Sequence, residues 1–592
     1  MNNTLKMTRR KLESLPSVPA KLTKSLPCDI YTAKVTETNQ TNLMRTARPV
    51  HKAVYSYVYP EIAPDPRLLA LSKPACNDLD LDANEILDDP QKFVSIFSGN
   101  KILPDTRPWS LCYAGHQFGY FAGQLGDGRA ISLFESVNSK GESWELQLKG
   151  AGRTPFSRFG DGYAVLRSSI REFLMSEHMH ALGVPTTRAL ALIETARDVY
   201  RDDGSTQKQP ETGAIVTRMS PSWLRFGNFQ IFYSRDDMDN VRRLADYAIE
   251  QVVKDTESSG PGNKYARFIR NVTKSTAKMV AEWQAIGFNH GVMNTDNMSI
   301  LGLTMDYGPF QIMDFYDPLY VCNHSDESGR YAFHRQPSVC MFNLLQLSAP
   351  LLELIGAGEA VDDLVFADIS DETKEGITDE STMEKYRDEG KVFLQGLLQN
   401  EFKDYFMQHL LAKMRSKIGL SESSSTQSDM DDVVIPLLDW MTTYRVDYHR
   451  FYRSLSNYKI TEHGEDADAE KAIIEWLDIK TQEDQLTEPS KEALKPWLAI
   501  YRHRLLKDKV DNEERKRHMD AVNPRFVLRN SIAQAVIQAF DDGTDEGEAR
   551  DALNACLDAC INPFKDHYQD KRVEDWINSP IPKNDMRCSC SS

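Results

Sequence analysis

The stretch Gly287–Asn297, which reads Gly-Phe-Asn-His-Gly-Val-Met-Asn-Thr-Asp-Asn, constrains this chain most, together with the Asp306-Tyr307-Gly308 that follows it. Asn and Asp side chains offer Mg²⁺ the hard oxygen ligands that it prefers, and a metal held in this way bridges nucleotide phosphates. The stretch therefore predicts a site for a metal ion and a nucleotide.

The spacing within this stretch is that of a protein-kinase catalytic loop, His-x-Asp-x-x-x-x-Asn, with one departure. Counted from His290, the catalytic aspartate position holds Val292, which cannot accept a proton, while the metal-binding position is filled by Asn297. Asp314 also follows a strand-like run, so spacing alone does not choose between Asp306 and Asp314 as the metal aspartate. The pattern predicts nucleotide and metal without the ordinary kinase base.

Three further parts of a phosphate-binding site precede this loop in kinase order. A glycine-rich segment covers 123–129, an alternating strand-like run ends at Lys149, and a helix expected from Ser168 to about Leu182 carries Glu172. A phosphate chain must be neutralised, and backbone N–H groups, a lysine held by a glutamate and a metal share that task. Each part alone fits a turn, a strand end or a helix start, but their joint order favours a nucleotide site.

Composition bounds the class of protein. A chain of 592 residues is expected to contain two or three structural units, and 70 Lys and Arg against 87 Asp and Glu give a net charge of −17. This negative charge would repel the phosphate backbone, which argues against nucleic acid as a general partner. No apolar run approaches the roughly 20 residues that span a bilayer, so no membrane association is expected. The nine cysteines show no metal-ligand spacing, which favours a reducing compartment.

Several longer motifs resemble the selenoprotein O family. They are Tyr113–Gly119, Gly123–Arg129, Glu145–Gly150, Leu166–Phe173, His290–Leu301 and Asn523–Asn530, and the resemblance runs from about residue 54 to the C-terminus. It implies a protein-kinase-like two-lobed fold of the α/β (α+β) class with a large helical C-terminal extension. It also implies a pseudokinase that transfers AMP from ATP to Ser, Thr or Tyr hydroxyls of proteins, with the ATP bound in a flipped orientation.

The resemblance also implies a role for each matching position. Asp296 is the proton acceptor, Asn297 and Asp306 hold Mg²⁺ (or Mn²⁺), and Glu172 pairs with Lys149. The expected ATP contacts are Gly126, Gly128, Arg129, Lys149, Asp161, Gly162, Arg218, Arg225 and Asp306. Of these, Lys149, Arg218 and Arg225 contact the phosphates. The family pattern favours Asp306 over Asp314.

The two ends of the chain carry separate expectations. Residues 1–50 are expected to be a flexible arm, with a mitochondrial presequence permitted by Leu5–Leu12, and a cytoplasmic location is the alternative. Many eukaryotic relatives carry selenocysteine third from the end, where this chain has Cys590, with Cys588 two residues before it. These thiols predict a redox tail over 581–592.

The expected organisation is a nucleotide-binding part over 51–240, a part with the metal and catalytic loop over 241–420, a linker over 421–432 and a helical part over 433–580. The expected function is protein adenylyltransferase. A protein kinase and a catalytically inactive nucleotide-binding scaffold are the alternatives, and label transfer from ATP distinguishes the three.

Overall fold

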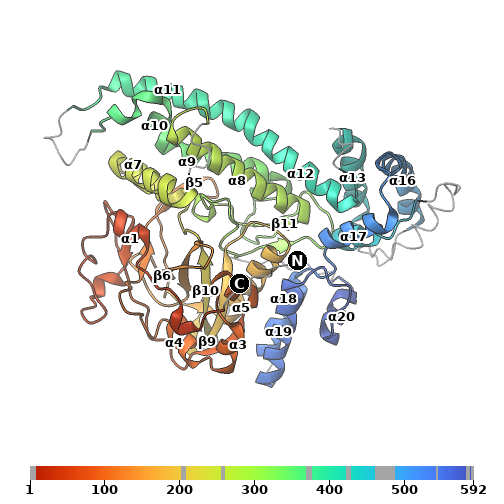
Figure 1. Ribbon diagram of the computed structural model, residues 1–592, viewed down its shortest axis with the longest axis horizontal. Helices are drawn as coiled ribbons and strands as arrows, with labels where there is room; N and C mark the ends of the chain where they lie inside the picture. The colour runs from red at the N-terminus through yellow and green to blue at the C-terminus, as the bar shows by residue number, and fades with distance from the viewer. Residues whose placement is uncertain are drawn as a thin grey trace, which may run out of the picture.

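A computed structural model describes residues 9–201, 209–254, 260–367, 376–421, 428–460, 487–541, 545–581 and 587. The fold is of the mixed α and β class, with one large sheet and many helices (Figure 1). Cys588, Cys590 and the serine-rich centre of the expected linker lie outside the described residues, while residues 428–434 belong to helical turns.

The large sheet is antiparallel and has the strand order β1-β3-β6-β7-β10-β9-β2, with β8 paired to β10. Its strands are β1 (Tyr55–Tyr57), β2 (Arg67–Leu71), β3 (Trp109–Leu111), β6 (Ala130–Val137), β7 (Ser143–Lys149), β8 (Ala164–Val165), β9 (Arg188–Tyr200) and β10 (Pro210–Ser220). The alternating run predicted to end at Lys149 is strand β7, which pairs with β6 in a register that sets Ala130 opposite Lys149. Lys149 is therefore held at the end of a central strand.

Two small antiparallel pairs lie outside this sheet. The hairpin β4 (Ala114–Gln117) and β5 (Tyr120–Gln124) precedes the glycine-rich segment, and β11 (Phe288–Asn289) pairs with β12 (Gln311–Ile312). The β11–β12 pair closes the loop that contains Asp296, Asn297 and Asp306, so both ends of that loop are anchored together.

Helix α5 (Leu166–Ala181) covers one face of the sheet against β9 and β10, and nearly all of its side chains are buried. On its other side lies α19 (Glu546–Ile561), which also contacts β2 (Figure 1). His178 of α5 forms a hydrogen bond of 3.0 Å with the carbonyl of Cys560. The last helices of the chain thus return to pack beside the sheet.

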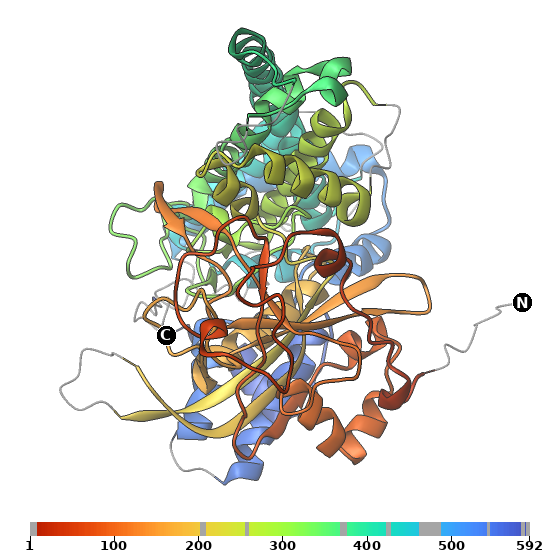
Figure 2. The ribbon, with the colours of Figure 1, turned by 90° about the vertical axis from the view of Figure 1, so that its left-hand side faces the viewer.

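The other helices form a layer on the far side of the loop 288–312 and continue into the C-terminal part (Figures 1 and 2). They include α6 (Phe226–Tyr233), α7 (Met238–Tyr247), α8 (Lys264–Ile286), α9 (Gln336–Ser348), α10 (Leu352–Gly356), α11 (Glu380–Gly396), α12 (Phe402–Ile418), α13 (Ile435–Tyr444), α14 (Tyr448–Leu455), α16 (Glu488–Asp508) and α17 (Asn512–Val522). Helices α18 (Asn530–Asp541) and α20 (Lys571–Asn578) lie beside α19 instead. Helix α8 ends at Gly287, whose φ of 72° is left-handed, as glycine allows at a helix C-terminus. This turn starts the metal-binding stretch where the sequence predicts it.

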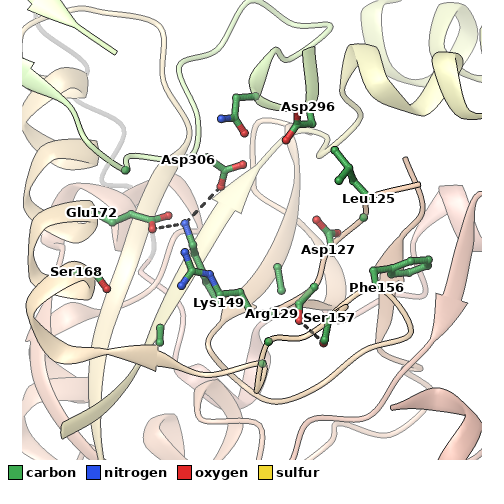
Figure 3. A pocket seen from close by; sticks show the side chains of 18 of the residues that line it. Leu125, Asp127, Arg129, Lys149, Phe156, Ser157, Ser168, Glu172, Asp296 and Asp306 are labelled. Atoms are coloured by element: carbon green, nitrogen blue, oxygen red, sulfur yellow. Dashed lines mark hydrogen bonds and ion pairs between the residues drawn. The ribbon is translucent and has the colours of Figure 1, made fainter. Parts of the chain in front are cut away.

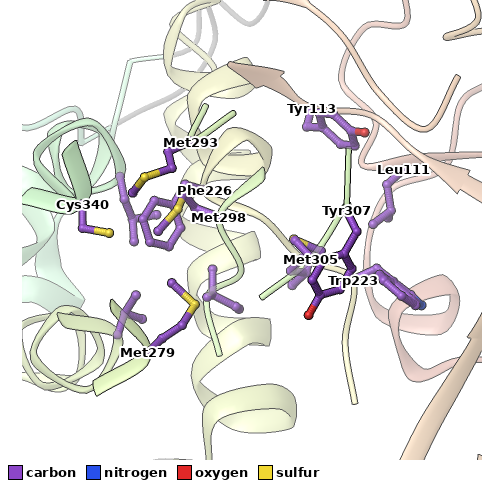
Figure 4. Close-up of a cluster of buried hydrophobic side chains, with 14 of the residues drawn as sticks. Leu111, Tyr113, Trp223, Phe226, Met279, Met293, Met298, Met305, Tyr307 and Cys340 are labelled. Atoms are coloured by element: carbon purple, nitrogen blue, oxygen red, sulfur yellow. The ribbon is translucent and has the colours of Figure 1, made fainter. Parts of the chain in front are cut away.

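The apolar side chains beneath that stretch belong to the main core. Met293 and Met298 are buried beside Phe226 of α6, Met279 of α8 and Cys340 of α9, and Met305 is buried beside Tyr307 and Trp223 (Figure 4). Trp283 of α8 donates a hydrogen bond of 2.8 Å to Thr304. The polar loop residues therefore lie on a close-packed apolar base, and this packing fixes their positions.

Residues 9–50, expected as a flexible arm, pack against the rest of the protein. Helix α1 (Lys21–Ser25) contributes Leu22 to the main core, and Val18 pairs with Glu135 of β6 through backbone hydrogen bonds of 2.9 and 3.0 Å. Helices α2 (Lys73–Asp78), α3 (Ala83–Asp88) and α4 (Gln91–Phe97) cover the other face of the sheet and line a separate apolar cluster.

One helical stretch among the described residues, Phe333–Gly356, is long and apolar enough to cross a membrane by length and composition. This corrects the expectation that no apolar run approaches that length. Since 67% of its most apolar window is buried inside the protein, the stretch has the character of a core helix.

Candidate active site

A cavity of about 630 Å³ lies between the end of β7, helix α5 and the loop 292–309 (Figure 3). All the nucleotide and metal residues predicted from the sequence line it. They are Gly126, Gly128, Arg129, Lys149, Asp161, Gly162, Glu172, Arg218, Arg225, Asp296, Asn297 and Asp306. The fold brings these residues to one site from segments up to 180 positions apart in the chain.

The carboxylate of Asp306 is the centre of the site's charge network. One oxygen accepts from Arg218 at 2.5 Å and lies 3.5 Å from the Lys149 ammonium, and the other pairs with Arg225. The side chains of Arg218 and Arg225 are only 3% exposed. Although burial opposes ionisation, these three cations hold the pKa of Asp306 well below its usual range. Three buried cations thus converge on one carboxylate.

Glu172 holds the cation cluster from the side of α5. Its two oxygens accept from Lys149 at 2.5 Å and from Arg218 at 3.0 Å. Burial lowers the pKa of Lys149, and the charges of Glu172 and Asp306 oppose that shift. The Lys149–Glu172 pair predicted from the sequence is therefore present as a contact.

Glycines let the backbone come close at the opposite wall. A Cβ at Gly162, where φ is 80°, would lie 2.2 Å from the carbonyl carbon of Gly152, and one at Gly126, where φ is 132°, would lie 2.5 Å from the Phe156 ring. Neither position accepts a side chain without movement of the chain. This wall therefore keeps the backbone at the surface of the cavity, with no side chain at either glycine to occupy the space.

Asp296 differs from Asp306 in its surroundings. One of its oxygens accepts from Gln117 at 3.2 Å, and the other has no hydrogen-bond partner among the described residues. Burial raises the pKa of Asp296 to about 6, and the charge of Arg225 opposes the shift. A carboxylate with a vacant oxygen and a raised pKa is suited to accept a proton near neutral pH.

Asn297 and Asp306 fit a magnesium ion that is shared with phosphates. The Asn297 amide nitrogen donates to the Val292 carbonyl at 3.0 Å, and Asn297 and Asp306 both line the cavity. No group of three or more His, Cys, Asp or Glu side chains capable of holding a metal occurs in the described part of the chain. Mg²⁺ commonly takes one or two protein ligands and completes its shell with phosphates and water, so this donor set fits it.

The alternative metal aspartate, Asp314, does not line the cavity. Its carboxylate accepts from Arg529 at 2.6 Å, and the same guanidinium donates to Asp447 at 2.8 Å. Asp314 thus ties β12 to the C-terminal part of the chain, which gives it a structural contact of its own.

Polar lining residues that contact the predicted ones, or are buried beside them, include Tyr113, Gln117, Asp127 and Arg201, none of which was predicted from the sequence as a site residue. Asp127 is buried and accepts a hydrogen bond from the Leu111 backbone N–H at 3.1 Å. The guanidinium carbon of Arg225 lies 4.8 Å from the centroid of the Tyr113 ring. Arg201 pairs with Asp161 at 2.7 Å, and Gln117 contacts Asp296. Tyr113, Gln117 and Asp127 stand within the motifs quoted above, which was the available signal, but Arg201 lies in a polar stretch without one.

Comparison of the sequence with known proteins shows the family. The sequence model of the family described as "Protein adenylyltransferase SelO" matches residues 39–556. The "Protein nucleotidyltransferase YdiU" of Thiobacillus denitrificans is 41% identical over 491 residues, 82% of this chain and 87% of that protein. Proteins with the same description are 39% identical in Azoarcus sp. over 92% of this chain and 95% of that protein, and 35% identical in Flavobacterium johnsoniae over 93% and 96%.

Proposed function

This chain belongs to the SelO family of protein adenylyltransferases and is a protein nucleotidyltransferase, and on that premise we propose that its cavity transfers AMP from ATP to Ser, Thr or Tyr hydroxyls of proteins. The observation that carries the proposal is the convergence of Lys149, Arg218 and Arg225 on Asp306. The three buried cations have Asp306, Glu172 and Asp127, which lies 3.5 Å from Arg225, as carboxylate partners, and such a cluster is suited to receive a polyphosphate.

The buried position of these cations supports a flipped orientation of ATP. Arg218 and Arg225 are almost fully buried, so they would bind the distal phosphates at the base of the cavity. The α-phosphate then faces the mouth, where an acceptor hydroxyl can approach it. In the Mg²⁺-loaded site the metal supplies charge neutralisation for the departing pyrophosphate, and Asn297 and Asp306 would hold it, with Mn²⁺ as an alternative.

Asp296 completes the reaction as proton acceptor. The substrate hydroxyl oxygen forms a bond to the α-phosphorus, the bond to the β-phosphate bridging oxygen breaks, and the hydroxyl proton passes to Asp296. Val292, which lines the cavity at the kinase base position, cannot take that proton.

Parallel labelling with α- and γ-labelled ATP tests the function. We expect protein-bound label from α-labelled ATP only, with pyrophosphate released. Label from γ-labelled ATP would instead indicate a kinase, and ATP binding without either label would indicate an inactive scaffold.

The pH dependence of transfer tests Asp296. Because the base must be ionised, the rate should rise with pH through about 6 and then level off, following the raised pKa of Asp296. Asp296→Asn should lower kcat by roughly a hundredfold or more and remove that limb of the profile. A variant with full activity and an unchanged profile would exclude Asp296 as the base.

The kinase-like two-lobed arrangement, the mitochondrial location and the redox tail are further parts of the proposal. The resemblance to selenoprotein O supports them, together with Leu5–Leu12 for import and Cys588 and Cys590 for the tail. A Cys-x-Cys disulfide closes a small, strained ring, so it should be easily reduced.

The tail proposal predicts a response to reductant. Oxidation of two thiols to a disulfide should slow transfer, and dithiothreitol should restore it in the wild type. Cys590→Ser should be indifferent to dithiothreitol, in a rate assay with α-labelled ATP. A wild type that responds no more than Cys590→Ser would show that the tail is not a switch.

A further inference from the structure

The β4–β5 hairpin connects the active-site cavity to an exposed aromatic tip. Gln117 at the end of β4 lines the cavity, the chain turns at Phe118 and Gly119, and β5 leads back to Leu125 and Gly126, which line the cavity again. Tyr120 and Phe121, which follow the turn, are 82% and 44% exposed. The hairpin is therefore flanked by lining residues at Tyr113 and Leu125 and carries exposed aromatic side chains close to the cavity.

Three consecutive residues of the hairpin are bonded to three consecutive residues of the catalytic loop. The His116 backbone N–H donates to Thr295 at 2.7 Å, the Gln117 amide donates to Asp296 at 3.2 Å, and the Phe118 N–H donates to Asn294 at 3.3 Å. The register of the hairpin is thus set against the proposed base. Whatever the hairpin tip holds is placed at a fixed position relative to Asp296.

The turn itself is strained and firmly held. Phe118 has a φ of 50°, an uncommon conformation for a bulky side chain, and Gly119 follows with a φ of 91°. The Phe118 N–H also donates to the Tyr331 hydroxyl at 2.9 Å, and the two rings pack with centroids 5.2 Å apart. Strain of this kind persists where the surroundings enforce it, and it is concentrated at functional sites.

The outer edge of β5 is open. Within the described chain, β5 pairs only with β4, and Tyr120, Phe121 and Ala122 are all exposed. An unpaired strand edge with apolar side chains is a ready template for another extended segment. A second exposed aromatic, Phe159, which is 98% exposed, lies between the lining residues Arg158 and Gly160 on another part of the rim.

We propose that β5 is the docking edge for the substrate protein, to which an extended segment adds as a third strand. Apolar side chains of that segment pack on Tyr120 and on Phe121, which point to opposite faces of the strand, and its Ser, Thr or Tyr hydroxyl is carried to Asp296. The inference rests on the proposed transferase function and adds the substrate class: an extended segment with an apolar residue beside the acceptor.

A positional-scanning peptide library tests this docking edge. Each peptide carries one central acceptor hydroxyl and one fixed flanking residue, and AMP transfer is measured with α-labelled ATP and Mg²⁺. We expect the wild type to prefer aromatic or large aliphatic residues over Gly or Asp at one or more flanking positions by about tenfold.

Two variants change the hairpin: the double variant Tyr120→Ser with Phe121→Ser, and the single variant Ala122→Lys. Ile30→Ser is the control, because Ile30 is 77% exposed and lies outside the hairpin. The double variant should remove the preference and raise KM for the preferred peptide about tenfold, with kcat and ATP affinity unchanged. Ala122→Lys should raise the same KM in the same direction, because lysine on an edge strand opposes pairing. Ile30→Ser should behave as wild type.

Three outcomes would overturn the inference. Unchanged preference and KM in both hairpin variants would exclude the edge while leaving transfer intact. Labelling of proteins in a cell lysate but of no peptide would exclude an extended segment as the docked form. No α-label on any peptide or protein would refute the transferase proposal itself, and the docking inference with it.

Discussion

Replacing Asp306 by alanine should abolish AMP transfer, with a loss of at least about a hundredfold. The change removes the charged member of the pair proposed to hold the metal. By neutralising the leaving pyrophosphate, that metal lowers the activation barrier by several kcal/mol. Asn297→Ala should act in the same direction. The measurement is the rate of transfer from α-labelled ATP at saturating Mg²⁺.

Asp306→Asn and Asp314→Asn are the matched controls for this prediction. Asp306→Asn keeps the shape of the side chain and removes its charge. Lys149, Arg218 and Arg225 then have less buried negative charge beside them. Asp306→Asn should bind ATP in the absence of metal at least as well as the wild type, because the cations no longer face a competing carboxylate. Asp314→Asn should keep most of its activity. An active Asp306→Ala beside an inactive Asp314→Asn would mean that Asp314 is the metal ligand.

Replacing Arg218 or Arg225 by alanine should weaken ATP binding by about ten- to a hundredfold and AMP binding far less. A charge-assisted hydrogen bond contributes roughly 1.5–3 kcal/mol, and both arginines are assigned to the distal phosphates that AMP lacks. Calorimetric titration of each variant with ATP and with AMP measures the difference.

Arg270→Ala provides the control. Arg270 of α8 forms an ion pair of 2.9 Å with Glu401 and does not line the cavity. It should change neither affinity. Equal losses of ATP and AMP affinity in Arg218→Ala and Arg225→Ala would contradict the flipped orientation, since those arginines would then contact the α-phosphate or the nucleoside.

Local patterns in the sequence predicted the elements that carry the site. Period-two alternation predicted the strand that ends at Lys149, and the helix expected from Ser168 to about Leu182 is α5, which carries Glu172. Such patterns are readable because strand and helix periodicity depend on neighbours a few residues apart. The motifs and the metal-binding stretch contained the lining residues Gly126, Gly128, Arg129, Lys149, Glu172, Asp296, Asn297 and Asp306, whereas Asp161, Gly162, Arg218 and Arg225 came only from the family resemblance.

Spacing along the chain left both Asp306 and Asp314 open, the family resemblance favoured Asp306, and the tertiary structure shows how the surroundings of the two aspartates differ. Both aspartates follow a similar local pattern. The Asp314 carboxylate accepts from Arg529, which lies 215 positions further along the chain. Lys149, Arg218 and Arg225 converge instead on the Asp306 carboxylate. The tertiary structure likewise placed Gln117 on Asp296 and returned α19 to the sheet beside α5. The physical reason is that spacing along the chain determines which side chains share a face of one element, whereas pairing between charges far apart in sequence depends on how the elements pack.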